Sequence, residues 1–455
     1  MLEDFEDATI GGLFCTSENK QIDERLVRRV LDLAVEIKQL LLKDGHAFKG
    51  RGNAGQVFRH QLETRMRADK ELLKHQSLVC ALFDWFLRYE TIENACDSMD
   101  EVSITSYTDW TDWGDGSLLN FKQGYASLLD WFCGQIPARG WIKLDKQVLN
   151  IECLRQNLQT GGWLETQGAR SYSRPILVRY APSASQSKGS ESNTSNSGTK
   201  VGLQTIECNH VIVTTSLGFL KQNYKSLFTP ELPETKGQLI RSIGFGTVNK
   251  IFLQFERPFW GESDGFKLVW SERDRSEFPA WAYDLIAFDV VRRQPNLLIG
   301  WIGGLGARLM EQELDVEIGE TCVRILERFL PENCKNKLTR LVGCSCSRWS
   351  SNPFVCGSYS FQSMESFEQN VDKLSEPIYD PSENGASKQP MSKSSVKTRT
   401  PRILFAGEAT AGKLYSTTHG AIISGWREAD RLADHLASAN DANNKPMVSR
   451  VDLKT

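Results

Sequence analysis

The sequence predicts an α/β fold that combines open-sheet strands with long helices. Strand patterns rich in Val and Ile recur from about residue 147 onward. Long stretches of helical periodicity precede them. The segment 402–436 has the pattern strand, Gly-Glu turn, loop and helix, which is typical of an open α/β sheet. At 455 residues the chain is long enough for two or three domains.

Helices are predicted wherever apolar residues recur at helical spacing. Residues 22–45 have this spacing and close on a glycine, and residues 71–96 form a second strong pattern. Residues 124–137 run from a glycine to a proline, which favours a shorter helix. An amphipathic helix is expected over 316–330.

Strands and two long loops make up most of the remaining chain. The loop 182–200 contains no large apolar residue, so it cannot offset its ordering entropy, and we expect it and the similar segment 380–400 to be disordered surface loops. Alternating or continuous apolar runs predict strands over 147–154, 175–181, 203–215, 248–260 and 296–304.

Composition excludes several classes of protein. A net charge of −3 gives no general basic field for nucleic acid. Eleven cysteines without disulfide-module spacing, and only six histidines, favour reduced thiols and no metal centre; Cys344 and Cys346 are too close for a usual zinc pair. No apolar run reaches ~18 residues, so no membrane-spanning helix is expected. The N-terminus is too acidic for a secretory signal, and the C-terminal residues "VDLKT" do not form a peroxisomal signal. We therefore expect a cytoplasmic protein that spans no membrane.

A ligand site is expected where the strand 403–406 ends. Ligands bind at the carboxyl ends of strands in open α/β sheets, and Gly407 lets the backbone approach a ligand closely. The following helix starts near 418–420, where small residues leave N–H groups uncovered and favour an anion, such as the pyrimidine ring of a reduced flavin. The alternative is an ordinary αβ unit with a capped helix.

Several blocks in the same order resemble the flavin amine oxidases, and within them the polyamine oxidases. The resemblance runs from about residue 80 onward, apart from the two long loops. It is carried by "SMDEVSITSYTDW" (98–110), "HVIVTTSLGFLK" (210–221), "IGFGTVNKIFLQFERPFW" (243–260), "RWSSNPFVCGSYSF" (348–361) and "LFAGEAT…YSTTHGA…SGWREADRL" in 402–436.

The resemblance implies FAD as a cofactor and gives one residue a catalytic role. Lys250 stands where these enzymes keep a lysine that holds a water against flavin N5, and an ammonium there promotes the reaction of reduced flavin with oxygen. The alternative is a solvent-facing lysine, but Lys250 shares a strand face with Phe252 and Gln254, so alternation does not force it outward. Ser358 replaces the flavin-linking cysteine of monoamine oxidases, so the FAD is expected to be non-covalent.

Other residues match flavin contacts of the family, although each could equally belong to the core. Val148 resembles the strand that meets the adenine, and Trp349 resembles the tryptophan lying along the flavin. The remaining expected FAD contacts are Gly407, Glu408, Ala409, Thr418 and Ala421.

The substrate contacts that the resemblance implies favour a polyamine. Tyr359 or Phe361 would form one wall of an aromatic cage, which suits an amine through cation–π contact. Ser416 and Thr417 match the opposite wall, where monoamine oxidases carry a tyrosine. Glu90 aligns with an acidic residue that binds a distal amine, although a solvated glutamate at a helix end explains it almost as well.

The dinucleotide fingerprint of the family has no convincing counterpart. The one G-x-G-x-x-G match, "GRGNAG" at 50–55, follows a polar helix end rather than a strand, so we interpret it as a loop between helices. The first βαβ unit of the family is therefore expected to be absent, so the resemblance implies an α/β fold with an incomplete, doubly wound Rossmann-like FAD domain and a mixed-sheet substrate domain carrying helices. Three interpretations remain: a partial sequence of an active enzyme, which we favour, a short inactive isoform, or a non-catalytic regulator that pairs with a full-length relative.

The expected function is oxidation of spermine, spermidine or their N1-acetyl forms with O2 to an aldehyde, a shorter amine and H2O2, by a monomer. The enzyme rival is a flavoprotein similar to histone demethylases, but neither an inserted coiled coil nor a chromatin-binding domain is visible. The expected division is 1–140, a helical part of the substrate domain; 141–245, FAD-domain strands; 246–360, substrate-domain sheet and helix; 361–440, a C-terminal FAD-binding segment; and 441–455, a tail.

Overall fold

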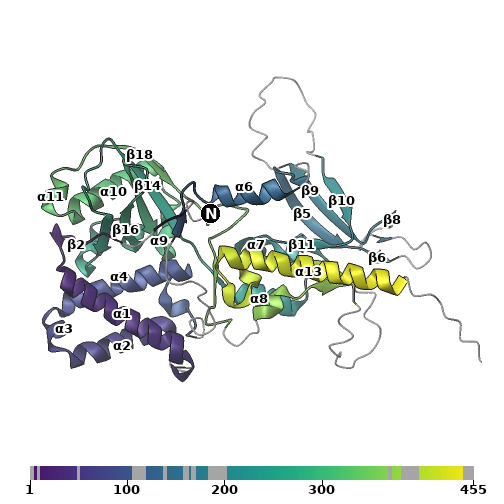
Figure 1. Ribbon diagram of the computed structural model, residues 1–455, viewed down its shortest axis with the longest axis horizontal. Coiled ribbons are helices and arrows are strands. Elements are labelled where there is room, and N and C mark those ends of the chain that lie inside the picture. Colours follow the sequence, from purple (N-terminus) through teal and green to yellow (C-terminus); the bar gives the residue numbers. More distant parts are fainter. Residues whose placement is uncertain are drawn as a thin grey trace, which may run out of the picture. The chain divides into compact units, whose positions relative to one another are not determined.

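In the computed structural model the chain forms two compact units (Figure 1). Unit 1 comprises residues 1–142, 216–222 and 239–370, and unit 2 comprises 143–215, 223–238 and 371–455. The structure describes residues 5–7, 11–48, 52–104, 119–136, 141–156, 163–164, 171–182, 202–366, 371–380 and 399–443.

Unit 1 is built on a seven-stranded sheet in the order β18-β14-β17-β16-β15-β2-β3. Neighbouring strands are antiparallel, except that β15 pairs with β2 in parallel. The bounds are β2 (Leu13–Thr16), β3 (Lys20–Gln21), β14 (Asn249–Phe255), β15 (Gly265–Val269), β16 (Leu285–Val290), β17 (Leu297–Ile302) and β18 (Leu341–Cys346). Two short pairs accompany it, β1 (Phe5–Asp7) with β4 (Leu119–Phe121) and β13 (Gly244–Phe245) with β19 (Ser360–Phe361).

Helices cover this sheet on both faces, so unit 1 has two apolar cores. Figure 1 shows α1, α2 and α4 on one side and α10 on the other, and each side contributes its own cluster of buried residues. Strand β15 is buried throughout, because it is covered on both faces. The helices are α1 (Glu24–Asp44), α2 (Ala54–Ala68), α3 (Lys70–Lys74), α4 (Gln76–Asn94), α6 (Ala126–Gln135), α9 (Gly304–Met310), α10 (Asp315–Phe329) and α11 (Glu332–Lys335), with 3-10 turns η2 (Gly45–Phe48), η3 (Met99–Glu101), η6 (Glu272–Ser276) and η7 (Ala280–Asp284).

The described residues of unit 2 contain three sheets and the long helix α13. One sheet has the order β10-β9-β5-β12, the second has β21 between parallel β11 and antiparallel β20, and the third is the antiparallel set β6-β7-β8. Its elements are β5 (Lys146–Cys153), β6 (Arg155–Gln156), β7 (Trp163–Leu164), β8 (Ser171–Tyr172), β9 (Ile176–Pro182), β10 (Gln204–Cys208), β11 (Val211–Val213), β12 (Phe228–Thr229), η8 (Val371–Ser375), β20 (Ile378–Tyr379), β21 (Pro401–Phe405), η10 (Glu408–Thr410), η11 (Gly412–Leu414) and α13 (Thr418–Asn443). Helices α7 (Leu217–Leu227) and α8 (Glu234–Ser242) have residues in both units.

Most expected elements are present, and two expectations about single elements are wrong. The single helix expected over 71–96 is divided, because α3 ends at Lys74 and α4 starts at Gln76. Asp69 caps α3 through its side chain, whereas His75 gives α4 no side-chain cap. The strand expected over 203–215 is divided between β10 and β11, which lie in different sheets. The loops expected over 182–200 and 380–400 lie almost entirely outside the described residues.

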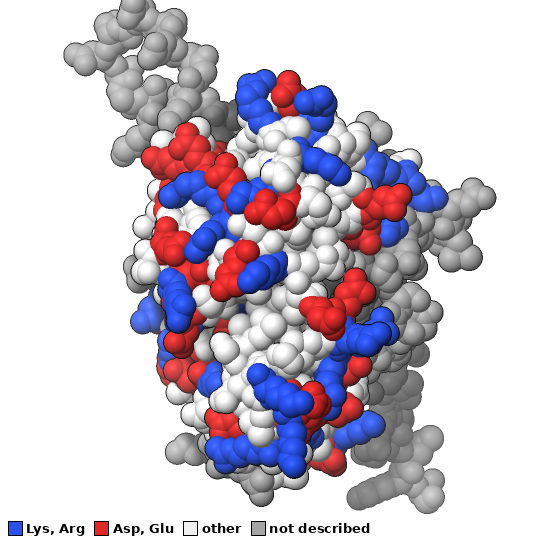
Figure 2. All heavy atoms as spheres, turned by 90° about the vertical axis from the view of Figure 1, so that its left-hand side faces the viewer, with Lys and Arg blue, Asp and Glu red and all other residues white. Residues whose placement is uncertain are grey.

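Charges of both signs are mixed on the face of unit 1 that Figure 2 shows, with no extended single-sign patch. This distribution agrees with the net charge of −3. None of the described helices is long and apolar enough to cross a membrane. Each of the 11 cysteines is a free thiol. The described residues contain no group of three or more potential metal ligands.

Candidate flavin and amine site

The turn after β21 is open enough for a ligand to approach its backbone. Gly407 has φ +120°, a conformation that L side chains rarely adopt. A Cβ atom added there would meet no other atom within 4 Å. The Gly407 N–H donates a 2.8 Å hydrogen bond to Ser424 Oγ, which ties the turn to α13. The expected contact residues Glu408 and Ala409 follow in η10, and both are half-buried.

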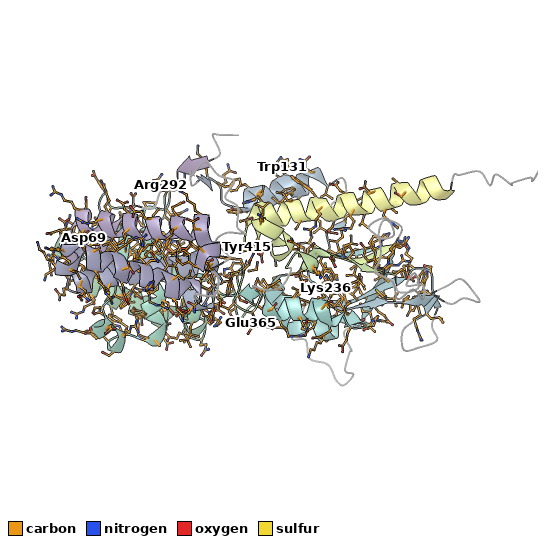
Figure 3. The ribbon with its side chains drawn as sticks, turned by 90° about the horizontal axis from the view of Figure 1, so that it is seen from below. Asp69, Trp131, Lys236, Arg292, Glu365 and Tyr415 are labelled. Atoms are coloured by element: carbon orange, nitrogen blue, oxygen red, sulfur yellow. The ribbon has the colours of Figure 1, made fainter. Side chains whose placement is uncertain are left out.

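The loop then returns to α13 through a second constrained residue. Ser416 has φ +64°, and its N–H donates a 2.7 Å hydrogen bond to Oε2 of Glu408. Thr417 Oγ1 accepts a 3.0 Å hydrogen bond from the Gly420 N–H and so caps the helix. Figure 3 labels the buried Tyr415 beside the start of α13. Glu408, Ser416 and Thr417 are thus brought together in unit 2.

The start of α13 fits an anionic group. Thr418 is exposed, Ala421 is half-buried, and Gly420 between them has no side chain, although the exposed His419 also lies in this first turn. The first N–H groups of a helix lack partners within the helix, and the helix dipole favours negative charge there. Together with the open turn at Gly407, this arrangement suits the phosphate or the reduced ring of a flavin.

Arg427 ties the middle of α13 to the same turn. Its guanidinium donates to the carbonyl oxygens of Thr410 and Phe405 at 2.6 and 2.9 Å, and to Oγ1 of Thr410 at 3.1 Å. Glu428, which is fully buried, accepts from Arg427 and from Arg431. These charge-assisted bonds fix η10, which carries Glu408 and Ala409.

Val148 lies on β5, in the other sheet of unit 2. Its side chain is 37% exposed, and the pairing of β5 with β9 shifts register directly after it. An exposed apolar side chain beside an irregularity in strand pairing is available for contact with a planar ring such as adenine. The expected adenine contact remains a proposal.

Lys250 lies on β14 in unit 1, on the less buried face of that strand. Asn249, Ile251 and Leu253 are buried, whereas Lys250 is half-buried. Its Nζ lies 4.6 Å above the centre of the Trp301 ring, from the strand directly opposite. Burial lowers the pKa of Lys250 below its usual value.

Among the described residues, Lys250 forms no ion pair. The carboxylate of Asp289, whose pKa is raised by burial, pairs instead with the buried Lys267 at 2.5 Å. An ammonium that lies half-buried over an aromatic ring, without a carboxylate partner among the described residues, is available to interact with a neighbouring ligand or water.

The loop that carries Trp349 is organised by Glu311. One carboxylate oxygen accepts from Asn249 Nδ2 at 2.7 Å and from the Ser350 N–H at 2.8 Å, and the other accepts from the Ser351 N–H at 2.6 Å. Asn249 in turn accepts a 3.3 Å bond from the Trp349 N–H. Trp349 itself is 44% exposed, so the network holds its backbone and leaves its ring accessible.

Replacing Glu311 with Gln is expected to loosen this loop. A glutamine amide has one acceptor oxygen, and its amide nitrogen would face a backbone N–H, so one of the Ser350 and Ser351 amides loses its partner. We expect these amides to exchange hydrogen about tenfold faster or more, because a lost partner costs about 1–3 kcal/mol. Hydrogen exchange with mass spectrometry measures this. The exposed Glu320→Gln on α10 is the control, and equal protection in both variants would contradict the network.

The two aromatic residues expected in the amine cage differ in burial. Phe361 is only 4% exposed and belongs to the apolar core on the α1–α4 side of the sheet. Tyr359 is half-buried, and its hydroxyl donates to the carbonyl oxygen of Ile92 in α4. Burial raises the pKa of Tyr359, so the phenol stays neutral. Tyr359 is thus the better candidate for a cage wall.

Glu90 is fully buried on α4, so it is not a solvated glutamate at a helix end. Its Oε1 accepts from Lys38 Nζ at 2.7 Å, and Lys38 is itself 30% exposed. A distal substrate ammonium would have to share this carboxylate with Lys38. The role of Glu90 in binding an amine remains a proposal.

The G-x-G-x-x-G match does not begin a strand–turn–helix unit. Its residues from Gly52 onward are described: Gly52 has φ +106°, Asn53 caps α2, and Gly55 lies in the first turn of that helix. The element before it is η2, which follows α1. The order is therefore helix, 3-10 turn, helix, rather than the strand and helix that cradle a pyrophosphate.

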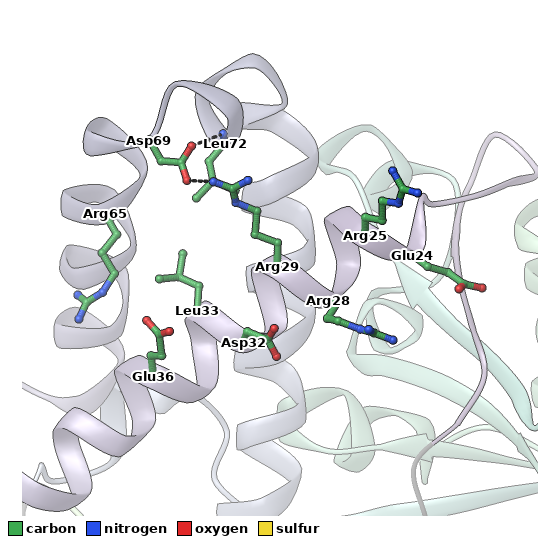
Figure 4. A pocket seen from close by; sticks show the side chains of 10 residues that line it. All are labelled: Glu24, Arg25, Arg28, Arg29, Asp32, Leu33, Glu36, Arg65, Asp69 and Leu72. Atoms are coloured by element: carbon green, nitrogen blue, oxygen red, sulfur yellow. Dashed lines mark hydrogen bonds and ion pairs between the residues drawn. The ribbon is translucent and has the colours of Figure 1, made fainter.

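A cavity of about 720 Å³ lies among α1, α2 and α3 (Figure 4). Positive and negative side chains alternate around it, and Asp69 pairs with Arg29, which lowers the pKa of that carboxyl. None of the expected site residues contributes to it. Its lining is Glu24, Arg25, Arg28, Arg29, Asp32, Leu33, Glu36, Arg65, Asp69 and Leu72.

Comparison with known proteins supplies the family. Residues 185–433 match the flavin containing amine oxidoreductase family. The peroxisomal N(1)-acetyl-spermine/spermidine oxidase of Bos taurus is 30% identical over 390 residues, which is 84% of this chain and 67% of that protein. This chain belongs to the flavin-containing amine oxidoreductase family. Its cofactor is therefore FAD, and its chemistry is that of an amine oxidoreductase.

Other relatives agree at the level of the family. The human peroxisomal N(1)-acetyl-spermine/spermidine oxidase is 40% identical over 232 residues, covering 49% of this chain and 42% of that protein. A possible lysine-specific histone demethylase 1 of Drosophila melanogaster is 31% identical over 54% of this chain and 27% of that protein.

Solved structures show the same fold at low identity. A putrescine oxidase bound to putrescine has a TM-score of 0.57 at 13% identity, and the cyclohexylamine oxidase of Brevibacterium oxydans has 0.58 at 14%. They cover 94% and 95% of this chain, and each match covers 83% of the other chain. The α/β fold expected from the sequence is thereby confirmed.

The expected site residues are divided between the two units of the structure. Unit 2 carries the expected flavin contacts at Gly407, at Glu408 and at the start of α13, and it also carries Val148. Unit 1 carries Lys250, Trp349, Tyr359, Phe361 and Glu90. Sequence reasoning missed Arg427 and Glu311. Arg427 lies within the quoted block "SGWREADRL", which was its available signal, whereas Glu311 is recognisable only through its contacts.

Proposed function

We propose that this chain is an FAD-dependent polyamine oxidase that acts on spermine, spermidine or their N1-acetyl forms. One secondary amine with a C–N bond to a CH2 group, one O2 and one water would give an aldehyde, a shorter primary amine and H2O2. Two hydrogens leave the substrate, and water then cleaves the C=N bond that remains. When bound, FAD supplies the two-electron acceptor for this oxidation.

The environment of Lys250 carries the proposal. An ammonium that lies half-buried over Trp301, with its pKa lowered by burial and no ion pair among the described residues, suits a water-holding and charge-stabilising role. A structural lysine on a strand edge would instead reach solvent or pair with a carboxylate. Lys250 would hold a water and supply positive charge where negative charge develops.

Preference for a polyamine rests on the residues expected at the substrate. Ser416 and Thr417 are small and polar where monoamine oxidases carry a tyrosine, which leaves room for an extended chain. Tyr359 would contact the amine nitrogen through its ring, and Glu90 would accept a distal ammonium in competition with Lys38. The names of the bovine and human relatives agree with this substrate class.

Two other functions remain as rivals. Histone demethylases are among the relatives, but their match covers only 27% of the Drosophila protein. A catalytically inactive partner of a full-length relative is the non-enzyme rival. It is motivated by the helical surroundings of "GRGNAG", which give this segment no dinucleotide cradle.

A substrate panel distinguishes these functions. The purified chain, supplied with FAD, is assayed for H2O2 with N1-acetylspermine, spermine, benzylamine and a dimethyl-lysine histone peptide. We expect turnover of at least one polyamine at a kcat/KM well above that of benzylamine. Turnover of the histone peptide alone, with formaldehyde as product, would favour the demethylase. Failure to bind FAD and to oxidise any amine would favour the inactive partner.

A further inference from the structure

Two cysteines on the edge strand β18 face the same way and lie close together. Cys344 and Cys346 are separated by one residue, and alternate residues of a strand share a face. Their Sγ atoms are 3.9 Å apart. Strand β18 ends its sheet beside β14, so no strand of the described residues covers its other edge.

The surroundings of the pair favour a reactive thiol at Cys344. The contact with the Cys346 thiol lowers the pKa of Cys344, burial and the Asp315 carboxylate oppose this shift, and the Arg348 guanidinium adds a smaller lowering. The same contact, together with burial, raises the pKa of Cys346. Cys322 on α10 is fully buried, and burial raises its pKa, so it is a poorer nucleophile.

Cys344 is also reachable from solvent. It lines a cavity of about 1150 Å³ between β18 and α10, together with the charged residues Asp315, Glu320, Glu327, Lys335 and Arg340. Both cysteines are half-buried. A small polar oxidant can therefore reach Cys344. Of the thiols near it, Cys322 is fully buried, and Cys346 is the second member of the pair.

We propose that Cys344 and Cys346 form a peroxide-sensitive dithiol that closes to a disulfide. The Cys344 thiolate attacks H2O2, which gives a sulfenic acid and hydroxide; the Cys346 thiol then attacks that sulfur, forms the S–S bond and releases water. In total, two thiols and one H2O2 become one disulfide and two waters. Successive alternate residues of a strand lie about 6.6 Å apart at Cα, which is near the upper limit of disulfide geometry at ~6.8 Å.

Closure of this disulfide would act on the strand that carries Lys250. Cys346 lies directly opposite Ile251, and the next residue, Ser347, exchanges hydrogen bonds with the Lys250 backbone at 2.8 and 3.0 Å. Because the span is at its limit, the bond pulls β18 out of regular geometry and disturbs these contacts. In an oxidase that releases H2O2, the pair would slow the enzyme as its product accumulates; this regulatory step alone rests on the proposed function.

Mass spectrometry tests the disulfide without reference to activity. The folded chain is treated with H2O2, its remaining thiols are alkylated, and it is digested with trypsin. Cleavage after Arg340 and Arg348 places both cysteines in one peptide, 341–348. We expect this peptide to lose two hydrogens and both alkylation sites. A cross-linked peptide joining Cys322 to either cysteine, or full alkylation of the peptide after treatment, would overturn the proposal.

Two variants separate the roles of the thiols. Cys346→Ser should leave a sulfenic acid on Cys344 that reacts with dimedone, whereas Cys344→Ser should give neither adduct nor disulfide. Cys356→Ser, a half-buried cysteine on a loop, is the control and should behave as wild type. Dimedone labelling of Cys346 in the Cys344→Ser chain would reverse the assignment.

The regulatory step has its own readout. If the chain turns over amines, peroxide pretreatment should lower the turnover rate of wild type, and a dithiol reductant should restore it. The turnover rates of Cys344→Ser and Cys346→Ser should not change on the same treatment. Unchanged turnover in a chain whose disulfide has formed would overturn the regulatory step. Disulfide formation in a chain that oxidises no amine would leave the dithiol standing and count against the proposed function.

Discussion

Replacing Lys250 with Met is expected to slow reoxidation of the reduced enzyme by O2 about 100-fold, the cost typical of removing one preorganised charge-stabilising group. Methionine preserves the packing over Trp301 but removes the ammonium. Stopped-flow absorbance after anaerobic reduction measures the rate. FAD content and thermal stability should change little, because no ion pair of Lys250 is lost among the described residues.

The matched control is Gln254→Met, an exposed residue on the same face of β14. It should reoxidise at the wild-type rate, and Lys250→Arg should recover part of the loss because it keeps the charge. If Lys250→Met and the control reoxidise equally fast, Lys250 has no role in the oxygen step.

The pH dependence follows from the lowered pKa of Lys250. The ammonium carries the proposed effect, so the rate advantage of wild type over Lys250→Met should be full at low pH. It should disappear as the pH rises through a pKa that burial places below the usual value of 10.5. The ratio of the two reoxidation rates against pH gives this step, and a ratio independent of pH up to 10.5 would contradict it.

Replacing Lys236 with Met is expected to destabilise the protein by about 3–5 kcal/mol. Lys236, labelled in Figure 3, is 5% exposed in α8, and its Nζ donates to the carbonyl oxygens of Lys373, Leu374 and Glu376 at 2.7–3.1 Å. It also lies 4.3 Å above the ring centre of Phe405 in β21. Methionine leaves three carbonyl oxygens without this donor.

Urea unfolding at pH 7 measures the change, because burial lowers the pKa of Lys236 only to about 8 and the side chain is still an ammonium there. The exposed Lys373→Met in η8 is the control, and we expect it to cost less than about 0.5 kcal/mol. The segment held by Lys236 contacts η10, so FAD binding should also weaken. A midpoint equal to that of the control would show that Lys236 does not hold η8.

Local elements could be predicted from the sequence wherever the apolar period was long. Helix α10 lies within one or two residues of its expected bounds, and β14 starts within one residue of its expected start, because helical and alternating patterns specify which face is buried. The break at His75 could not be predicted, since Leu72 and Val79 on either side of it keep the seven-residue spacing of one helix face. The division of 203–215 into β10 and β11 depends on which distant strands pair, and β11 pairs with β21 some 190 residues later.

For the candidate site, the sequence could predict only which residues stand at positions that match the family's blocks, and not which side chains they contact. Gly407 and Glu408 were recognisable because the strand–Gly–Glu pattern has a local physical reason. The partners of these residues were not: Trp301 reaches Lys250 through strand register, and Lys38 reaches Glu90 between two helices. Such contacts depend on tertiary packing, which no local pattern encodes.

Whether this chain binds FAD and reduces it with a polyamine is measured by the visible absorption spectrum of the purified 455-residue chain, reconstituted with FAD and then given spermine or N1-acetylspermine without oxygen. We expect a bound-flavin band near that of other flavoproteins, its bleaching by the amine, and its return when air is admitted. A folded chain that stays colourless after FAD is supplied, or a flavin band that no polyamine bleaches, would contradict this expectation.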